Sequence, residues 1–338
     1  MLQRCCVRPL VVLPVLLITI GAAFILVAAR SAAGDTMGDL RESSEINAVP
    51  ERAAEQEITA LEGPWVVAIQ PGHWKIAELP EEHERRRGNI GAVHNGVREV
   101  DINVAVAAEL VRLVEAEGWV PVVVPATVLP GLRADAFISI HADWSSSRNR
   151  HGWKLAAPWS PSEAASELSH ELRRSFRAEP GLQEDAGGVT IGMRGYFGFS
   201  HTRFTYASSP YTPAVLVELG FVTHDAERTR MAERPDYYAA IIHRGLVNYF
   251  AGRDRMDTAS LVPREFAIMV AADDGTPVLR SSDPESEVVR DLKAGEIVQP
   301  LDKANGWYEV RLRTTGQSGW VRTVDLMPHE SVLVVAGD

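Results

Sequence analysis

Three polar side chains stand at or near the ends of apolar runs, where they could bind a metal ion or move a proton. His73 and His141 each end such a run, and Glu218 lies within residues 213–221. Glutamate is rarely buried without a partner, so a carboxylate inside an apolar run indicates a site rather than simple packing. Imidazole and carboxylate groups together favour metal-assisted hydrolysis or general acid–base chemistry.

The elements that carry these side chains are expected to be buried strands. Residues 134–143, ADAFISIHAD, form the kind of apolar run that is typical of parallel sheets covered by helices on both faces. Residues 65–73 and 213–221 repeat the pattern. The carboxyl ends of parallel strands meet at one edge of a sheet, where active sites collect. We therefore predict an α/β fold with a mostly parallel twisted sheet flanked by helices, which brings both histidines and the glutamate to one edge.

Helices are expected between the strands. An apolar stripe predicts a helix over about residues 101–117, so that Glu99 lies just ahead of its first turn. Two further helices are expected over about residues 160–177 and 235–250. Residues 187–212 are rich in glycine, aromatic rings and cations, which fits a substrate-binding lip and fits an ordinary irregular loop nearly as well.

Four short motifs follow one another in the chain: QPGH at 70–73, REVDIN at 98–103, SIHAD at 139–143 and VELGF at 217–221. Together they resemble the signatures of the zinc-dependent N-acetylmuramoyl-L-alanine amidases, which cut peptidoglycan. The resemblance implies that His73, Glu99 and His141 bind Zn²⁺ and that Glu218 is the catalytic general base. It also implies hydrolysis of the amide that joins the lactyl group of N-acetylmuramic acid to L-alanine.

The implied ligand set is chemically reasonable, although the motifs depart from the resembled family at several positions. Two histidines, one glutamate and an open fourth position are known in zinc hydrolases, and a site that stays net positive lowers the pKa of a bound water toward about 7. Gln70 stands where the family commonly has Asp, and its neutral amide would orient His73 less firmly than a carboxylate. Trp74 and Lys75 replace two glycines and could narrow the cleft, and Asp143 replaces a common Asn.

The amino-terminal part has the pattern of a membrane anchor. Residues 9–29 carry no charge and are long enough, at 1.5 Å per residue, to cross a hydrocarbon layer of about 30 Å. We expect residues 1–30 to form an N-terminal transmembrane signal-anchor, with a cleaved signal peptide as the alternative. Arg4 and Arg8 precede this span, so the following chain is predicted on the extracytoplasmic side of the cell membrane, or secreted after cleavage. Both cysteines also precede it, so the exported part can form no disulfide.

Composition divides the remaining chain into four parts. Residues 31–63 form an acidic linker, residues 64–252 the predicted zinc amidase domain, residues 253–264 a second linker and residues 265–330 a small domain. The net charge of the 338 residues is -11 and no basic patch is present, which argues against nucleic acid as a partner.

The small domain is predicted to be a small all-β barrel, because short β-branched runs alternate with glycine or aspartate turns. It resembles a bacterial SH3 domain, with Gly-Trp pairs at Trp307 and Trp320. Such domains accompany wall hydrolases and bind wall peptides. For these two tryptophans, packing in the core is a better interpretation than contact with a ligand.

We therefore expect a membrane-anchored zinc amidase that acts on peptidoglycan in cell-wall remodelling or lysis. Two alternatives stay open. The first is a zinc peptidase or amidase that cuts another wall bond, and the products would separate it from the main prediction. The second is a non-catalytic peptidoglycan-binding protein with an amidase fold, which would clear no wall material even with added zinc.

Overall fold

The computed structural model describes residues 58–312 and 315–329. The predicted anchor, residues 1–30, and most of the acidic linker lie outside these residues. Within the described ranges, none of the helices combines the length and the apolar character that a membrane crossing requires.

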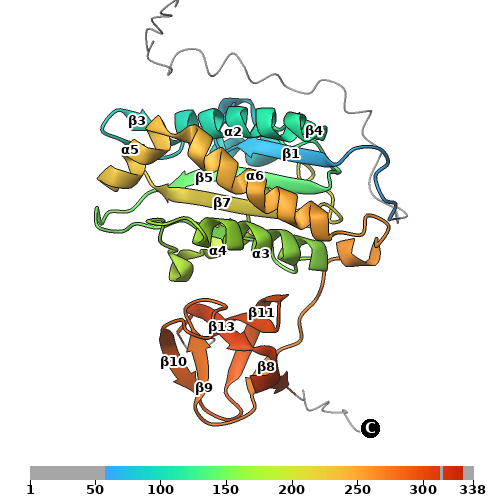
Figure 1. Ribbon diagram of the computed structural model, residues 1–338, viewed down its shortest axis with the longest axis vertical. Helices are drawn as coiled ribbons and strands as arrows, with labels where there is room; N and C mark the ends of the chain where they lie inside the picture. Colours follow the sequence, from blue (N-terminus) through green and yellow to red (C-terminus); the bar gives the residue numbers. More distant parts are fainter. Residues whose placement is uncertain (1–57, 313–314, 330–338) are drawn as a thin grey trace, which may run out of the picture. The chain divides into compact units, whose positions relative to one another are not determined.

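A five-stranded sheet lies at the centre of the larger domain, in the order β4-β1-β5-β7-β6 (Figure 1). Four of its strands run parallel, and the short edge strand β6 pairs antiparallel with β7. The expectation of a mostly parallel α/β sheet is confirmed. The strands are β1 (Val66–Pro71), β4 (Val120–Val123), β5 (Ala136–Asp143), β6 (Lys154–Ala156) and β7 (Ala214–Phe221).

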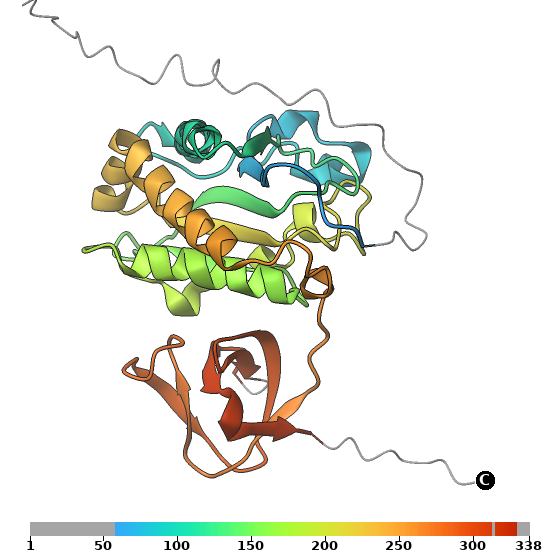
Figure 2. The same cartoon turned by 45° about the vertical axis from the view of Figure 1, so that its right-hand side comes forward.

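Three long helices cover one face of this sheet: α2 (Glu99–Ala116), α3 (Glu163–Arg177) and α6 (Pro235–Gly252). Figure 2 shows α6 crossing between α2 and α3, and it contacts both. The shorter helix α5 (Asp225–Glu233) follows β7. Alternate side chains of the strands, such as Ile69, Ile138 and Val217, are fully buried under these helices.

Helix α3 illustrates why the sequence folds in this way. The Ser162 side chain accepts a hydrogen bond from the Ala165 backbone N–H and caps the first turn, so the helix begins at Glu163 rather than near residue 160. Leu168, Leu172 and other apolar side chains at helical spacing are fully buried, and each such side chain stabilises the fold by roughly 1.5–3 kcal/mol.

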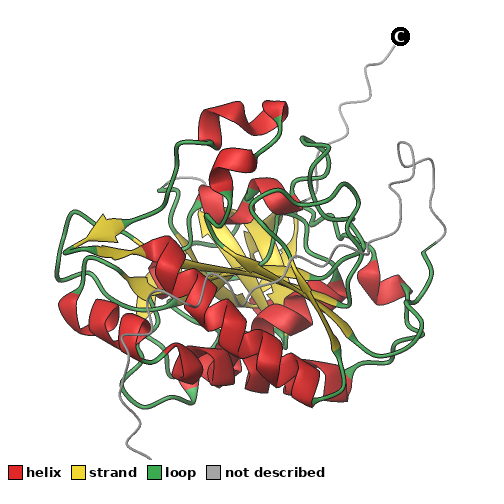
Figure 3. Ribbon diagram, turned by 90° about the horizontal axis from the view of Figure 1, so that it is seen from above, coloured by secondary structure: helices red, strands yellow, loops and turns green. Residues whose placement is uncertain are grey.

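The opposite face of the sheet is covered by short helical turns and loops (Figure 3). Phe137 of β5 and Leu216 of β7 pack there against Met193 and Phe199 from the irregular segment 187–212. Short elements rather than long helices cover this face, so a site can lie between them. The short elements are η1 (Ile76–Glu78), η2 (Glu81–Arg86), η3 (Ala186–Gly188), α4 (Ile191–Arg194), η4 (Phe197–Phe199) and the hairpin of β2 (Val93–His94) and β3 (Val97–Arg98).

The C-terminal part is all-β, as predicted, and is consistent with an SH3-like domain. Its antiparallel sheet has the order β10-β9-β13-β12-β11-β8-β14. Trp307 and Trp320 are buried together with Leu279, which confirms that these tryptophans are core residues. The elements are η5 (Ala259–Leu261), β8 (Met269–Ala271), β9 (Thr276–Leu279), β10 (Val288–Leu292), β11 (Ile297–Ala304), β12 (Trp307–Leu312), β13 (Ser318–Arg322), η6 (Thr323–Asp325) and β14 (Leu326–Pro328).

Candidate metal centre

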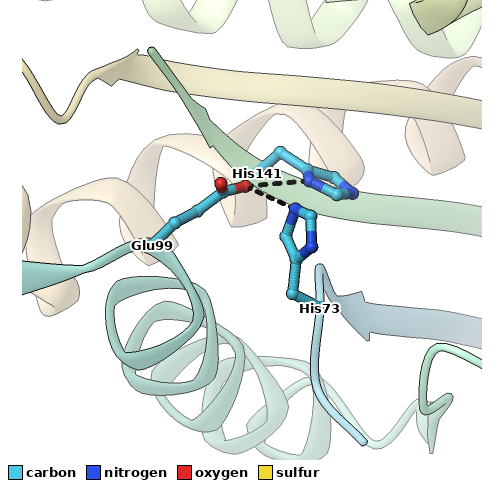
Figure 4. Close-up of side chains that lie close together, drawn as sticks. All are labelled: His73, Glu99 and His141. Atoms are coloured by element: carbon cyan, nitrogen blue, oxygen red, sulfur yellow. Dashed lines mark hydrogen bonds and ion pairs between the residues drawn. The ribbon is translucent and has the colours of Figure 1, made fainter. Parts of the chain in front are cut away.

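His73, Glu99 and His141 meet at one edge of the parallel sheet (Figure 4). The Glu99 Oε1 atom lies 3.2 Å from Nε2 of His73 and 3.0 Å from Nδ1 of His141. One ligand atom from each of the three side chains lies within 4.8 Å of the others. The structure thus brings the three predicted metal ligands together.

Three different elements deliver these side chains. His73 directly follows β1 and has a positive φ of 65°, while His141 lies in the last part of β5. Glu99 was expected just ahead of a helix, but it is the first residue of α2, which begins two residues earlier than predicted. Its backbone N–H donates to the carbonyl of Ala92, which continues the turn into the helix.

The orientation of His73 is fixed by a backbone carbonyl. Its Nδ1 lies 2.7 Å from the carbonyl oxygen of Asn89, so Nδ1–H donates there and Nε2 is left for the site. Gln70 does not hold His73. It is fully buried, donates to the Pro125 carbonyl and accepts a hydrogen bond from the Tyr196 hydroxyl at 2.8 Å. The departure at Gln70 therefore affects the wall of the site rather than the orientation of His73.

Glu99 is held as an anion. Burial favours the neutral acid, but hydrogen bonds from His141 and His73, and their charges, outweigh burial and hold the pKa of Glu99 well below its usual range. The backbone N–H groups of Ala92 and Ala142 also donate to its two oxygens, at 2.7 and 3.2 Å. A carboxylate that is ionised and fixed in place is a suitable metal ligand.

The surroundings shift the pKa values of the two histidines in opposite directions. Burial lowers the pKa of His141 and keeps its imidazole neutral, the form that binds metals. For His73, burial also lowers the pKa, but the hydrogen bond and the charge of Glu99 raise it by more. Nε2 of His141 is buried and has no hydrogen-bond partner within the described residues.

Two glycines leave the space that these donors occupy. A Cβ atom at Gly72 would lie 2.4 Å from Cε1 of His141, and one at Gly91 would lie 2.6 Å from Oε2 of Glu99. Neither position tolerates a side chain without displacing a donor. Two imidazoles and one carboxylate that converge with no side chain between them fit a divalent ion such as Zn²⁺.

Glu218 lies next to this group. It is half-buried on β7, opposite His141 in the register of β5 and β7. Its Oε2 atom is buried and has no hydrogen-bond partner within the described residues. Burial and the charges of Glu99 and Asp143 raise the pKa of Glu218 well above its ordinary value, while the charge of Lys154 opposes this rise.

Comparisons with known proteins agree with this arrangement. Residues 125–248 match the family model described as N-acetylmuramoyl-L-alanine amidase, and this segment contains His141 and Glu218. This part of the larger domain is therefore similar to the amidase family. Residues 278–326 match the model of a bacterial dipeptidyl-peptidase Sh3 domain, which agrees with the all-β, SH3-like C-terminal part.

Individual relatives of the amidase domain are distant. The chain is 27% identical over 173 residues to the N-acetylmuramoyl-L-alanine amidase LytC of Bacillus subtilis (strain 168), and the match covers 47% of this chain and 33% of that relative. The solved amidase AmiC2 of Nostoc punctiforme has 20% identity and a TM-score of 0.40, over 56% of this chain and 98% of that one. The apo form of Ami1 from Mycobacterium abscessus has 22% identity and a TM-score of 0.41, and the match covers 56% of this chain and 100% of that one.

The metal centre of the amidase domain opens into a cavity of about 530 Å³, a size typical of small-molecule sites. His73, His141 and Glu218 line it, so the proposed ligands and the proposed base face the same space. The segment 187–212, for which the sequence left a binding lip and an ordinary loop open, forms part of the wall of this cavity. Its lining residues include Ile191, Met193, Tyr196, Phe197 and Arg203.

Trp74 and one arginine of the segment 187–212 do not face this cavity. Trp74 was expected to narrow the cleft, but it is only 4% exposed and packs in the core beneath the long helices. Arg194 is also buried and forms an ion pair with Glu309 of β12. Both side chains therefore have a structural role.

The sequence did not reveal Lys154, although a lysine in the middle of the apolar residues 153–157 was a signal. Lys154 is fully buried on β6, opposite Glu218, and forms ion pairs with Asp143 and Asp185. A buried ammonium group requires such partners. Asp143 of β5 therefore has a chemical counterpart on the edge strand β6, on the far side of β7.

Proposed function

We propose that this protein hydrolyses the amide bond between N-acetylmuramic acid and L-alanine in peptidoglycan, with Zn²⁺ held by His73, Glu99 and His141. The observation that carries the proposal is the convergence of these three donors beside Glu218 at one open cavity. The match of residues 125–248 to the amidase family model supports the choice of bond.

Each side chain has a distinct task in this reaction. Zinc, when bound, would supply Lewis-acid polarisation of the amide carbonyl and of a water molecule. Asn89 and the backbone N–H of Ala142 hold His73 and Glu99 in the orientation that the ion requires. The Glu218 carboxylate accepts a proton from the attacking water. It then returns this proton to the alanine nitrogen as the C–N bond breaks.

Two substitutions test these tasks separately. Glu218→Gln keeps the size of the side chain but cannot accept the proton, so we expect kcat to fall by roughly 10²–10⁴-fold while the zinc content is unchanged. His141→Ala removes a ligand, so we expect the zinc content of the purified full chain to fall as well. Full activity of Glu218→Gln on purified peptidoglycan, with zinc content matched to the wild type, would remove Glu218 from the mechanism.

Mass spectrometry of the products identifies the bond. Cleavage at the proposed position gives a free lactyl carboxylate on the sugar and a free amino group on L-alanine. Products that keep the sugar–alanine amide would instead support a peptidase that cuts another wall bond. A zinc-loaded protein that binds peptidoglycan without releasing any product would support a binding function.

We also propose that residues 1–30 hold the protein on the extracytoplasmic side of the cell membrane. The support is the uncharged span of residues 9–29 with arginines on its amino-terminal side. An anchored protein stays in the membrane fraction after an alkaline wash. Release by the wash, together with a mature amino terminus beyond residue 30, would indicate cleavage and secretion.

The SH3 domain is proposed to bind wall peptides. Because Trp307 and Trp320 are buried, binding must use other side chains. Co-sedimentation of the full chain with peptidoglycan, in the absence and presence of competing stem peptide, measures this binding. No displacement by the peptide would argue against it.

A further inference from the structure

The cavity that opens from the metal centre has two arginines in its wall. Arg86 ends the short helix η2, and Arg203 belongs to the segment 187–212, far away in the sequence. Neither forms an ion pair with a carboxylate within the residues that the structure describes, whereas many other arginines of the chain do. Two cations without an acidic partner in the wall of a cavity are suited to bind an anionic ligand.

Aromatic rings hold both guanidinium groups. The guanidinium carbon of Arg86 lies 5.4 Å from the ring centre of Phe197 and 5.2 Å from that of Phe204. Arg203 lies 5.1 Å from the same Phe204 ring. Nη1 of Arg86 lies 3.4 Å from Nδ1 of His83, and the other N–H groups of a guanidinium group that packs on a ring stay available at its edge, in the fork geometry that matches a carboxylate.

The wall that carries these arginines is fixed by contacts between η2 and the segment 187–212. His83 is fully buried and its ring packs against Phe197 and Phe204, with ring centres 4.7 and 4.5 Å away. Glu82 accepts hydrogen bonds from the backbone N–H groups of Thr205 and Tyr206, at 3.0 and 2.7 Å. Its oxygens are thereby engaged with the backbone, and the two arginines are ordered before any ligand binds.

We propose that Arg86 and Arg203 bind a free carboxylate of the stem peptide while the sugar–alanine amide lies at the metal centre. This inference rests on the proposed function and specifies its substrate further: the preferred substrate carries a carboxylate, not a carboxamide, beyond L-alanine. Both groups line the same cavity as His73 and Glu218, so one bound molecule can contact the arginines and the reacting atoms.

The test compares two substrates that differ only in this group: N-acetylmuramoyl-L-alanyl-D-glutamate whose γ-carboxyl is capped as the methylamide, so that only the α-carboxylate is free, and its D-isoglutamine counterpart with the same cap, in which the α-carboxylate is an amide. We expect the wild-type protein, loaded with zinc, to have a kcat/KM roughly 10- to 100-fold higher for the acid, the usual effect of hydrogen bonds to a charged group. In Arg86→Gln this preference falls to near one. The matched control is Arg85→Gln, because Arg85 is the preceding residue, is exposed and lies outside the cavity wall.

A binding measurement separates this inference from the proposed function. Calorimetric titration of both compounds into Glu218→Gln, with and without Arg86→Gln, gives the preference without any turnover. A preference for the acid that disappears with Arg86→Gln supports the arginine site. It does so even if the wild type cleaves neither compound, because the lack of cleavage would refute only the amidase proposal. Equal affinity for acid and amide, or the same preference in Arg86→Gln, overturns the arginine site and leaves the amidase proposal standing.

Discussion

A methyl group at position 91 should damage the metal centre without touching any ligand residue in the sequence. Gly91 has a φ of +81°, and a Cβ atom there would lie 2.6 Å from Oε2 of Glu99 and 2.9 Å from Cδ2 of His73. Cβ atoms essentially never approach another atom closer than 3.0 Å, so the Glu99 oxygen must retreat by at least about 0.4 Å. Metal–ligand distances tolerate only about 0.2 Å, so one of three ligands moves out of place.

Gly91→Ala therefore combines two effects whose sizes can be separated. The positive φ costs alanine about 1–2 kcal/mol of folding free energy. The displaced ligand should weaken zinc binding by roughly 10- to 100-fold, the range seen when residues that orient metal ligands are changed. Gly96→Ala is the matched control, because Gly96 has a φ of +79° and nothing within 4 Å of the added Cβ.

The assay measures zinc affinity by competition with a chromophoric chelator and the melting temperature of the zinc-free proteins. Both variants should melt a few degrees below the wild type, since 1 kcal/mol corresponds to about 2–4 °C for a domain of this size. Only Gly91→Ala should lose zinc affinity. If Gly91→Ala and Gly96→Ala bind zinc equally well, the three residues do not hold the ion in the arrangement that the structure shows.

Three further predictions concern the surroundings of the site and the stability of the fold. Lys154→Met leaves the carboxylates of Asp143 and Asp185 without their buried cation. Because Asp143 is partly exposed and Asp185 also pairs with Arg150, we expect the free energy of unfolding, measured in urea, to fall by about 2–3 kcal/mol. An unchanged urea midpoint would contradict a stabilising role of Lys154. Burial and nearby arginines lower the pKa of His170 from 6.5 to about 4. The unfolded chain thus binds this proton first as the pH falls, so stability should decrease from pH 6.5 toward pH 4, and His170→Gln should remove that part of the slope. Chelation of bound metal should lower the melting temperature, since a ligand at 100 times its Kd stabilises the folded state by about 2.7 kcal/mol, and an unchanged value would argue against the site.

The parallel sheet was predictable because its signal is local. A strand that is covered on both faces needs consecutive apolar residues, and residues 134–143 and 213–221 show that pattern without reference to the rest of the chain. The candidate ligands followed from residue type and from their place at the ends of these runs. His73 and His141 stand out in this way, whereas Glu99 was named as a ligand through the resemblance of the four motifs to the zinc amidases, and the structure places the three together.

The surroundings of these residues were not predictable, because they depend on contacts between distant parts of the chain. The carbonyl of Asn89, which orients His73, leaves no mark on the side-chain pattern. Trp74 looked like an obstacle in the cleft, but the turn after β1 directs it into the core.

What the sequence determined by itself is the two histidines and the strands that deliver them, since both depend on neighbouring residues, while Glu99 of α2 came from the resemblance of the motifs. Only the tertiary structure decided what faces these donors. The antiparallel pairing of β6 with β7 places Lys154 opposite Glu218, and the packing of η2 against residues 187–212 places Arg86 in the cavity wall. Both facts arise from the pairing of segments separated by more than 50 residues. Hydrophobic periodicity reports only whether a residue is buried, and it does not encode which segments pair.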